Sequence, residues 1–88
     1  MNMSKGEKMS QTEKNVLSWL KIPSYLELAR TIENVPKSAR EISAAIALQD
    51  TRVAEMLEYL EGVNAVEHTS SGWILTTLAK QVLAKYFQ

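Results

Sequence analysis

Apolar residues recur with a helical period along the first half of the chain, in stretches that begin at capping sequences. In "SQTE", Ser10 and Glu13 form a capping box, in which each side chain bonds the other residue's backbone N–H. The short apolar stripe that follows contains Val16, Leu17, Trp19 and Leu20. Pro23 interrupts this stripe and suits the first position of a new helix. The stretch "SYLELARTIENV" therefore predicts a second helix over residues 24–35, ending before Pro36.

A second capping box starts the next pair of helices. In "SARE", Ser38 is the cap and Glu41 lies three residues further on. One face of the third helix is then expected to carry Ile42, Ala45, Ile46 and Leu48. After the short interruption "LQD", Asp50 is expected to cap a fourth helix. Its apolar positions recur at i, i+3, i+4 and i+7, and they are Val53, Met56, Leu57 and Leu60.

The period changes after Gly62. The β-prone runs "AVEH" and "GWIL" are separated by "TSSG", which supplies turn residues and predicts a β-hairpin. Thr76 is expected to cap a last helix, whose broad apolar stripe contains Leu78, Ala79, Val82, Leu83, Tyr86 and Phe87. The fold class predicted is mostly α with a small β-hairpin, as one domain over residues 10–88 that follows a flexible tail over residues 1–9.

Composition restricts the chemistry. The 88 residues suffice for a single core, and the chain contains no cysteine and only one histidine, His68. We therefore expect no disulfide, no metal, no other cofactor and no catalytic triad, and a protein that is not an enzyme. No apolar run approaches the length of about 18 residues that spans a bilayer, which predicts a soluble, cytoplasmic protein without a membrane partner. Ten basic and ten acidic side chains cancel.

From Ser38 to Leu75 the order of helix, short turn, helix and β-hairpin resembles a winged helix-turn-helix. The chain is similar over residues 23–83 to the small regulators of the MarR and ArsR types. The matching apolar positions are Ile42, Ile46, Leu48, Val53, Met56, Leu57 and Leu60. Ser43 and Ala47 occupy sites that are usually small, and Asn64 in "LEGVNAV" occupies the slot of a glycine. The resemblance implies a winged-helix fold with additional helices at both ends.

The function that this resemblance implies is DNA-binding transcription regulation, with double-stranded DNA as the partner. The apolar positions of the predicted fourth helix face the core. Because successive residues are 100° apart, its opposite side then faces outward. Groove contacts are assigned there to Thr51, Arg52, Glu55 and Tyr59. Phosphate contacts are assigned to Arg40 and Gln49, and wing contacts to Ser70, Ser71 and Trp73. For Glu55 a solvated face is an equal interpretation, while solvation is favoured for Glu58 and Glu61, and core packing for Trp73.

Charge favours a second function. Residues 38–75 hold Arg40 and Arg52 against six acidic side chains, a net charge of −4. Phosphate contacts normally provide most of the affinity for nucleic acid, and this segment is poorly suited to them unless lysines of the tail contribute. The alternative is a protein-interaction module that uses its acidic helix face to bind a basic protein partner.

The two terminal apolar stripes predict an additional contact. In MarR-like proteins the first and last helices pair across a two-fold axis, which implies a homodimer. The expected interface consists of Val16, Trp19, Leu20, Leu78, Val82, Leu83, Tyr86 and Phe87. The alternative is that the two helices pack against each other within one chain.

Overall fold

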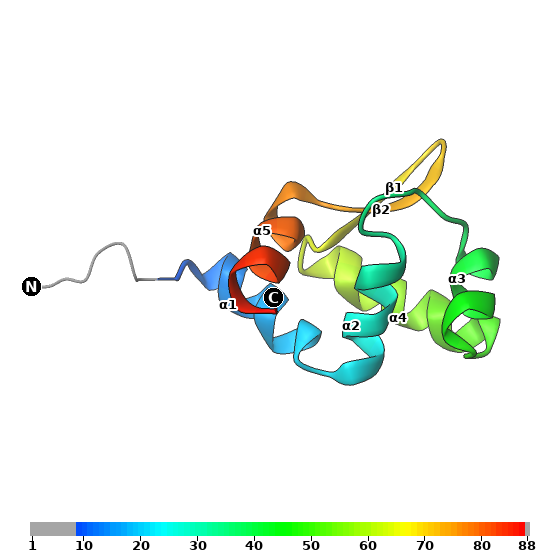
Figure 1. Cartoon of the computed structure of the whole chain (residues 1–88), viewed down its shortest axis with the longest axis horizontal. Coiled ribbons are helices and arrows are strands. Elements are labelled where there is room, and N and C mark those ends of the chain that lie inside the picture. The colour runs from blue at the N-terminus through cyan, green and yellow to red at the C-terminus, as the bar shows by residue number, and fades with distance from the viewer. Residues whose placement is uncertain (1–8, 88) are drawn as a thin grey trace, which may run out of the picture.

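The computed structural model describes residues 9–87, which form five helices and one β-hairpin (Figure 1). The predicted tail falls almost entirely outside this range. The elements in chain order are α1 (Gln11–Leu20), α2 (Pro23–Thr31), α3 (Ala39–Ile46), α4 (Asp50–Gly62), β1 (Val66–Thr69), β2 (Gly72–Leu75) and α5 (Thr77–Tyr86). The predicted fold class is confirmed, because the chain is mostly helical with one antiparallel hairpin and is compatible with a winged-helix-like fold.

The predicted helix starts at the two capping boxes are confirmed. The Glu13 backbone N–H donates to the Ser10 hydroxyl at 3.1 Å, and the Glu41 N–H donates to the Ser38 hydroxyl at the same distance. In both boxes the glutamate accepts in return from the backbone of the cap. Pro23 occupies the first turn of α2, as expected. These local signals alone fix where α1, α2 and α3 begin.

The predicted end of the second helix was wrong, because α2 stops at Thr31 instead of residue 35. Ile32 leaves the helical conformation at φ −110° and ψ 15°, although its side chain is still buried. The inward-facing stripe is then complete, and Val35 is 54% exposed. Leaving the helix early lets the chain run back toward the hairpin, where Lys37 pairs with Trp73.

The predicted cap of α4 also needs correction. Gln49, not Asp50, is the capping residue, and its side chain makes no capping hydrogen bond. Asp50 is instead the first helical residue, where its negative charge interacts favourably with the positive end of the helix dipole. Thr76, by contrast, caps α5 as predicted, with its hydroxyl accepting from the Ala79 N–H at 3.1 Å.

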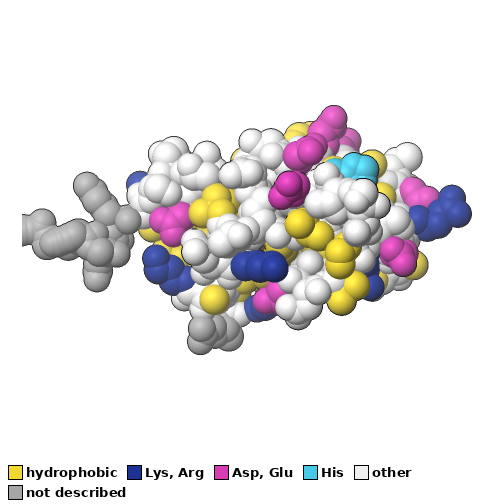
Figure 2. Space-filling model, turned by 90° about the horizontal axis from the view of Figure 1, so that it is seen from above, with side chains coloured by type: hydrophobic (Ala, Val, Ile, Leu, Met, Phe, Trp, Pro, Cys, Tyr) yellow, Lys and Arg dark blue, Asp and Glu magenta, His cyan; other side chains and the backbone are white. Residues whose placement is uncertain are grey.

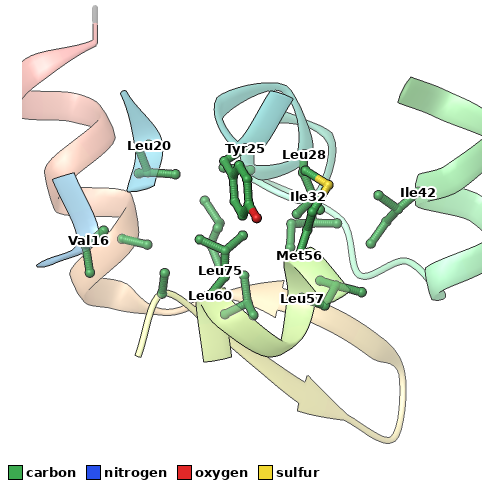
Figure 3. Packing of buried hydrophobic residues seen from close by; sticks show 14 of the residues in the cluster. Val16, Leu20, Tyr25, Leu28, Ile32, Ile42, Met56, Leu57, Leu60 and Leu75 are labelled. Atoms are coloured by element: carbon green, nitrogen blue, oxygen red, sulfur yellow. The ribbon is translucent and has the colours of Figure 1, made fainter. Parts of the chain in front are cut away.

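The core lies between the helices and the base of the hairpin (Figure 3). All four predicted apolar positions of α4 are buried within it, as are Ile42 and Ile46 of α3. Ala45 was wrongly placed on the inner face of α3, because it is exposed. Ser43 is buried in its place, and its hydroxyl donates to the Leu48 carbonyl across the turn. This bond satisfies a polar side chain at the close approach of α3 and α4.

Helices α1 and α5 pack against each other within the chain (Figure 1). Four residues of the predicted dimer interface are therefore inaccessible, namely Val16, Leu20, Val82 and Leu83, each at most 1% exposed. Their assignment to a contact between two copies needs correction, because they complete the core of one chain. The remaining members of that set are partly or largely exposed, with Tyr86 at 41%.

The hairpin is attached to the domain through its second strand. Trp73 pairs with Lys37 through two backbone hydrogen bonds, of 3.2 and 2.8 Å, which extend the two-stranded sheet by an isolated bridge. Gly72 adopts φ +127°, and a Cβ at this position would lie 2.8 Å from the Lys37 carbonyl oxygen. Only glycine fits both this conformation and this close approach. The hairpin is thereby held at a defined position relative to α4.

Candidate binding cleft between α4 and the hairpin

An open cleft of about 550 Å³ lies between the outward face of α4 and the facing side of the hairpin. Its lining consists of Thr51, Ala54, Glu55, Glu58, Glu61, His68 and Trp73. Figure 2 shows acidic side chains gathered next to the histidine on this side of the molecule. The volume is in the range of sites that bind small molecules or a few side chains of a partner.

The acidic wall of the cleft follows from the spacing of residues in α4. Because Val53, Met56, Leu57 and Leu60 are buried, the helical period turns the opposite side of α4 outward. Glu55, Glu58 and Glu61 are three residues apart, so neighbouring members of this row rise by about 4.5 Å along the axis. The row places three carboxylates along one side of the helix, facing the hairpin.

The opposite wall is an aromatic pair on the hairpin. His68 and Trp73 are cross-strand partners, and their rings are stacked with centroids 4.3 Å apart at 11°. Trp73 is half-buried and packs against the core, as the sequence favoured, while it also lines the cleft. This contact fixes the indole and leaves the imidazole exposed at the rim.

Two of the residues predicted to contact a DNA groove do not line the cleft and make contacts within the chain. The guanidinium of Arg52 bonds Glu55 at 3.1 Å and lies 5.8 Å from the centroid of the Tyr25 ring. Tyr59 stacks on Trp19 at 5.2 Å and 10°, on the side of α4 that faces α1. Trp19, which was assigned to a dimer interface, is thus engaged in its own chain. The other two groove residues, Thr51 and Glu55, line the cleft.

The remaining predicted contact residues do not line the cleft. Arg40 and Gln49 are exposed near the start of α3 and just before α4, and Ser70 and Ser71 are exposed in the turn between the strands. The Ser71 N–H donates to the Thr69 hydroxyl, which orders that turn. The structure therefore brings only three of the predicted residues together in the cleft, namely Thr51, Glu55 and Trp73.

Sequence reasoning missed the contribution of Glu58, Glu61 and His68 to a common site. The glutamates were interpreted as a solvated face, and the histidine was considered only as the single histidine of the chain. The sequence feature that connects these three residues is the short link between α4 and β1. It turns the chain back, so that β1 lies beside the helix. A residue two positions into that strand then faces the last turns of the helix.

The electrostatics of the cleft are one-sided. Three of its seven lining residues carry a carboxylate and none is a lysine or arginine. Carboxylates gathered at a concave surface attract cations and raise their local concentration. Within residues 9–87, no group of three or more histidine, aspartate or glutamate side chains is arranged to hold a metal ion. The carboxylates of the cleft therefore favour a positively charged group.

No protein-family model matches the chain, and no curated protein is significantly similar to it. In the described part of the chain, none of the helices combines the length and the apolar character that crossing a membrane requires.

Proposed function

We propose that this chain is a winged-helix interaction module that binds a positively charged protein segment in the cleft between α4 and the hairpin. The observation that carries the proposal is the lining of this cleft by three carboxylates without a lysine or arginine. Such a surface complements lysine and arginine side chains and repels phosphate. The stacked His68 and Trp73 rings supply an apolar wall for the methylene stems of those side chains.

Charge removal tests this proposal. The probe is a short synthetic lysine-rich peptide, titrated by calorimetry at low and at moderate salt. We expect binding that weakens with salt, and a loss of about threefold in affinity for Glu58→Gln, which is the size of one exposed ion pair.

Glu27→Gln is the matched control for this experiment. Glu27 is exposed on α2 and is not among the cleft residues, so its substitution changes the net charge equally but should leave the affinity unchanged. Equal losses of affinity for the two variants would mean that the peptide binds by nonspecific attraction, which would contradict a site in the cleft. Absence of binding at low salt would also contradict it.

Sequence-specific DNA binding by a homodimer is the second candidate function. The order of α3, turn, α4 and hairpin supports it, together with the exposed Thr51, Arg40 and Gln49 near the starts of α3 and α4. Such a dimer would use the accessible remainder of the terminal stripes, which includes Leu78, Tyr86 and Phe87.

A titration with mixed duplex DNA at the same two salt concentrations separates the candidates. Salt-sensitive binding that weakens in Arg52→Ala supports the DNA-binding function. A dimer that does not bind duplex even at low salt would exclude it.

A further inference from the structure

Strand β1 has one edge without a neighbour. On the other side of the sheet, β2 pairs with Lys37 through both the N–H and the carbonyl of Trp73. The order across the sheet is therefore Lys37, β2, β1. Within residues 9–87, no further strand or bridge pairs with β1.

The backbone N–H and carbonyl of His68 point away from β2, toward this free edge. His68 and Trp73 are directly opposed in the antiparallel register. Opposed residues alternate between pairs that are hydrogen-bonded to each other and pairs that are not. Because the N–H and carbonyl of Trp73 bond Lys37 instead, the pair of His68 and Trp73 is of the second kind. The His68 N–H and carbonyl consequently face outward, and no described residue outside the hairpin bonds them.

This open edge borders the acidic cleft. The His68 side chain lines the cleft on the same face of the hairpin as Trp73. A residue that pairs with His68 on an added strand would place its side chain on that same face. The residues two positions before and after it would do the same, at a spacing of about 6.6–6.8 Å. Every second side chain of an added strand would thus point to the side on which Glu55, Glu58 and Glu61 lie.

We infer that the partner binds as an extended segment that pairs with the free edge of β1 and carries lysine or arginine at alternate positions. The inference rests on the proposed function and specifies its partner. Backbone hydrogen bonds to His68 fix the position of the segment along β1, while the carboxylates of α4 select positively charged side chains. Exposed edge strands are normally protected by charged side chains, and here the outward-facing Glu67 would disfavour a partner with acidic residues on its other face.

The test uses a seven-residue synthetic peptide in which lysine alternates with threonine. Its matched control carries N-methyl groups on the backbone nitrogens of the lysines, which removes the hydrogen-bond donors and keeps all charges. We expect the methylated peptide to bind at least about tenfold more weakly. Equal affinities, within about twofold, would overturn strand pairing while the charge-based proposal for the cleft would survive. Absence of binding by both peptides would instead overturn the proposed function itself.

A substitution in the protein tests the same bond from the other side. His68→Pro removes the outward N–H, and because proline is tolerated at the free side of an edge strand, the hairpin should persist. His68→Ala keeps the N–H and loses the ring, so it is the matched variant. We expect His68→Pro to bind the unmethylated peptide at least about tenfold more weakly than His68→Ala, with unchanged circular dichroism. Equal affinities of the two variants would contradict strand pairing.

Hydrogen exchange gives a readout that does not depend on variants. The Glu67 amide lies at a hydrogen-bonded position of the hairpin and should be protected in both the free and the bound protein. The His68 amide should exchange rapidly in the free protein and become protected only with the unmethylated peptide. Protection of His68 in the free protein, accompanied by a dimer in sedimentation, would assign the edge to a second copy of the chain and overturn the inference.

Discussion

Gly72 provides a quantitative test of how the hairpin is held above the cleft. In Gly72→Ala, the new Cβ would lie 2.8 Å from the oxygen and 2.9 Å from the carbon of the Lys37 carbonyl, which are rigid backbone atoms. The conformation at φ +127° is itself strained for alanine, at about 1–3 kcal/mol. Relief by moving the strand would break the two bonds between Lys37 and Trp73, each worth about 0.5–1.5 kcal/mol.

We therefore expect Gly72→Ala to lower the free energy of unfolding by about 2–6 kcal/mol, a large share of the roughly 4–13 kcal/mol typical of a chain of this length. Urea unfolding followed by circular dichroism measures this change. Gly62 is the matched control, because it ends α4 without a positive φ, and a Cβ added there would meet nothing within 4 Å. Gly62→Ala should be neutral or stabilise by up to about 1 kcal/mol. A Gly72→Ala protein within about 0.5 kcal/mol of the wild type would refute the close contact.

Three further predictions concern local features of the fold. Ala47→Gly should stabilise the protein by about 1 kcal/mol in urea unfolding, because Ala47 adopts the left-handed conformation at φ 57°. Hydrogen bonds from the Ser38 backbone and hydroxyl lower the pKa of Glu41 below 4.5, so its stabilising effect should be complete above pH 4.5 and disappear as the pH falls through the lower folded pKa. The stability difference between wild type and Glu41→Gln should therefore vanish in acid, and a constant difference would contradict this. Tyr59→Ala should lower the free energy of unfolding by about 1 kcal/mol, because the stack on Trp19 is lost, and should leave the affinity for the lysine-rich peptide unchanged. A lower affinity would place the partner on the other side of α4.

The features that were predicted correctly from sequence are those set by neighbouring residues. The capping boxes at Ser10 and Ser38 specify helix starts through bonds that span three positions, and the period of Val53, Met56, Leu57 and Leu60 specifies the buried face of α4. Asn64, which occupies the slot of a glycine, adopts the left-handed backbone conformation at φ 66°, and this too is a local property.

The features that sequence reasoning missed depend on distant pairings. The chain leaves α2 early and reaches a bridge between Lys37 and Trp73, 36 positions apart, which no local pattern predicts. Periodicity also cannot tell whether an apolar stripe faces its own chain or a second copy, and for Val16 and Val82 the structure decides for the same chain. The cleft belongs to this class, because His68 meets the glutamates of α4 only after the hairpin has been positioned.

The positions of the cleft carboxylates distinguish the two candidate partners energetically. A duplex laid against α4 and the hairpin presents one negative charge for about every 1.7 Å of its axis, so phosphates would face Glu55, Glu58 and Glu61. In water, one such pair at about 6 Å is repulsive by about 0.7 kcal/mol, and three pairs by about 2 kcal/mol, before screening by salt. A segment with lysines at the same distance gains what the duplex loses, so the difference between the two partners is at most about 4 kcal/mol, and both screening by salt and the ion pair of Arg52 with Glu55 reduce it. Of the two arginines in residues 38–75, Arg52 already contacts Glu55, and Arg40 makes no ion pair with a described residue. A duplex would have to compensate elsewhere, whereas a cationic segment needs no contact outside the cleft and the adjoining strand edge.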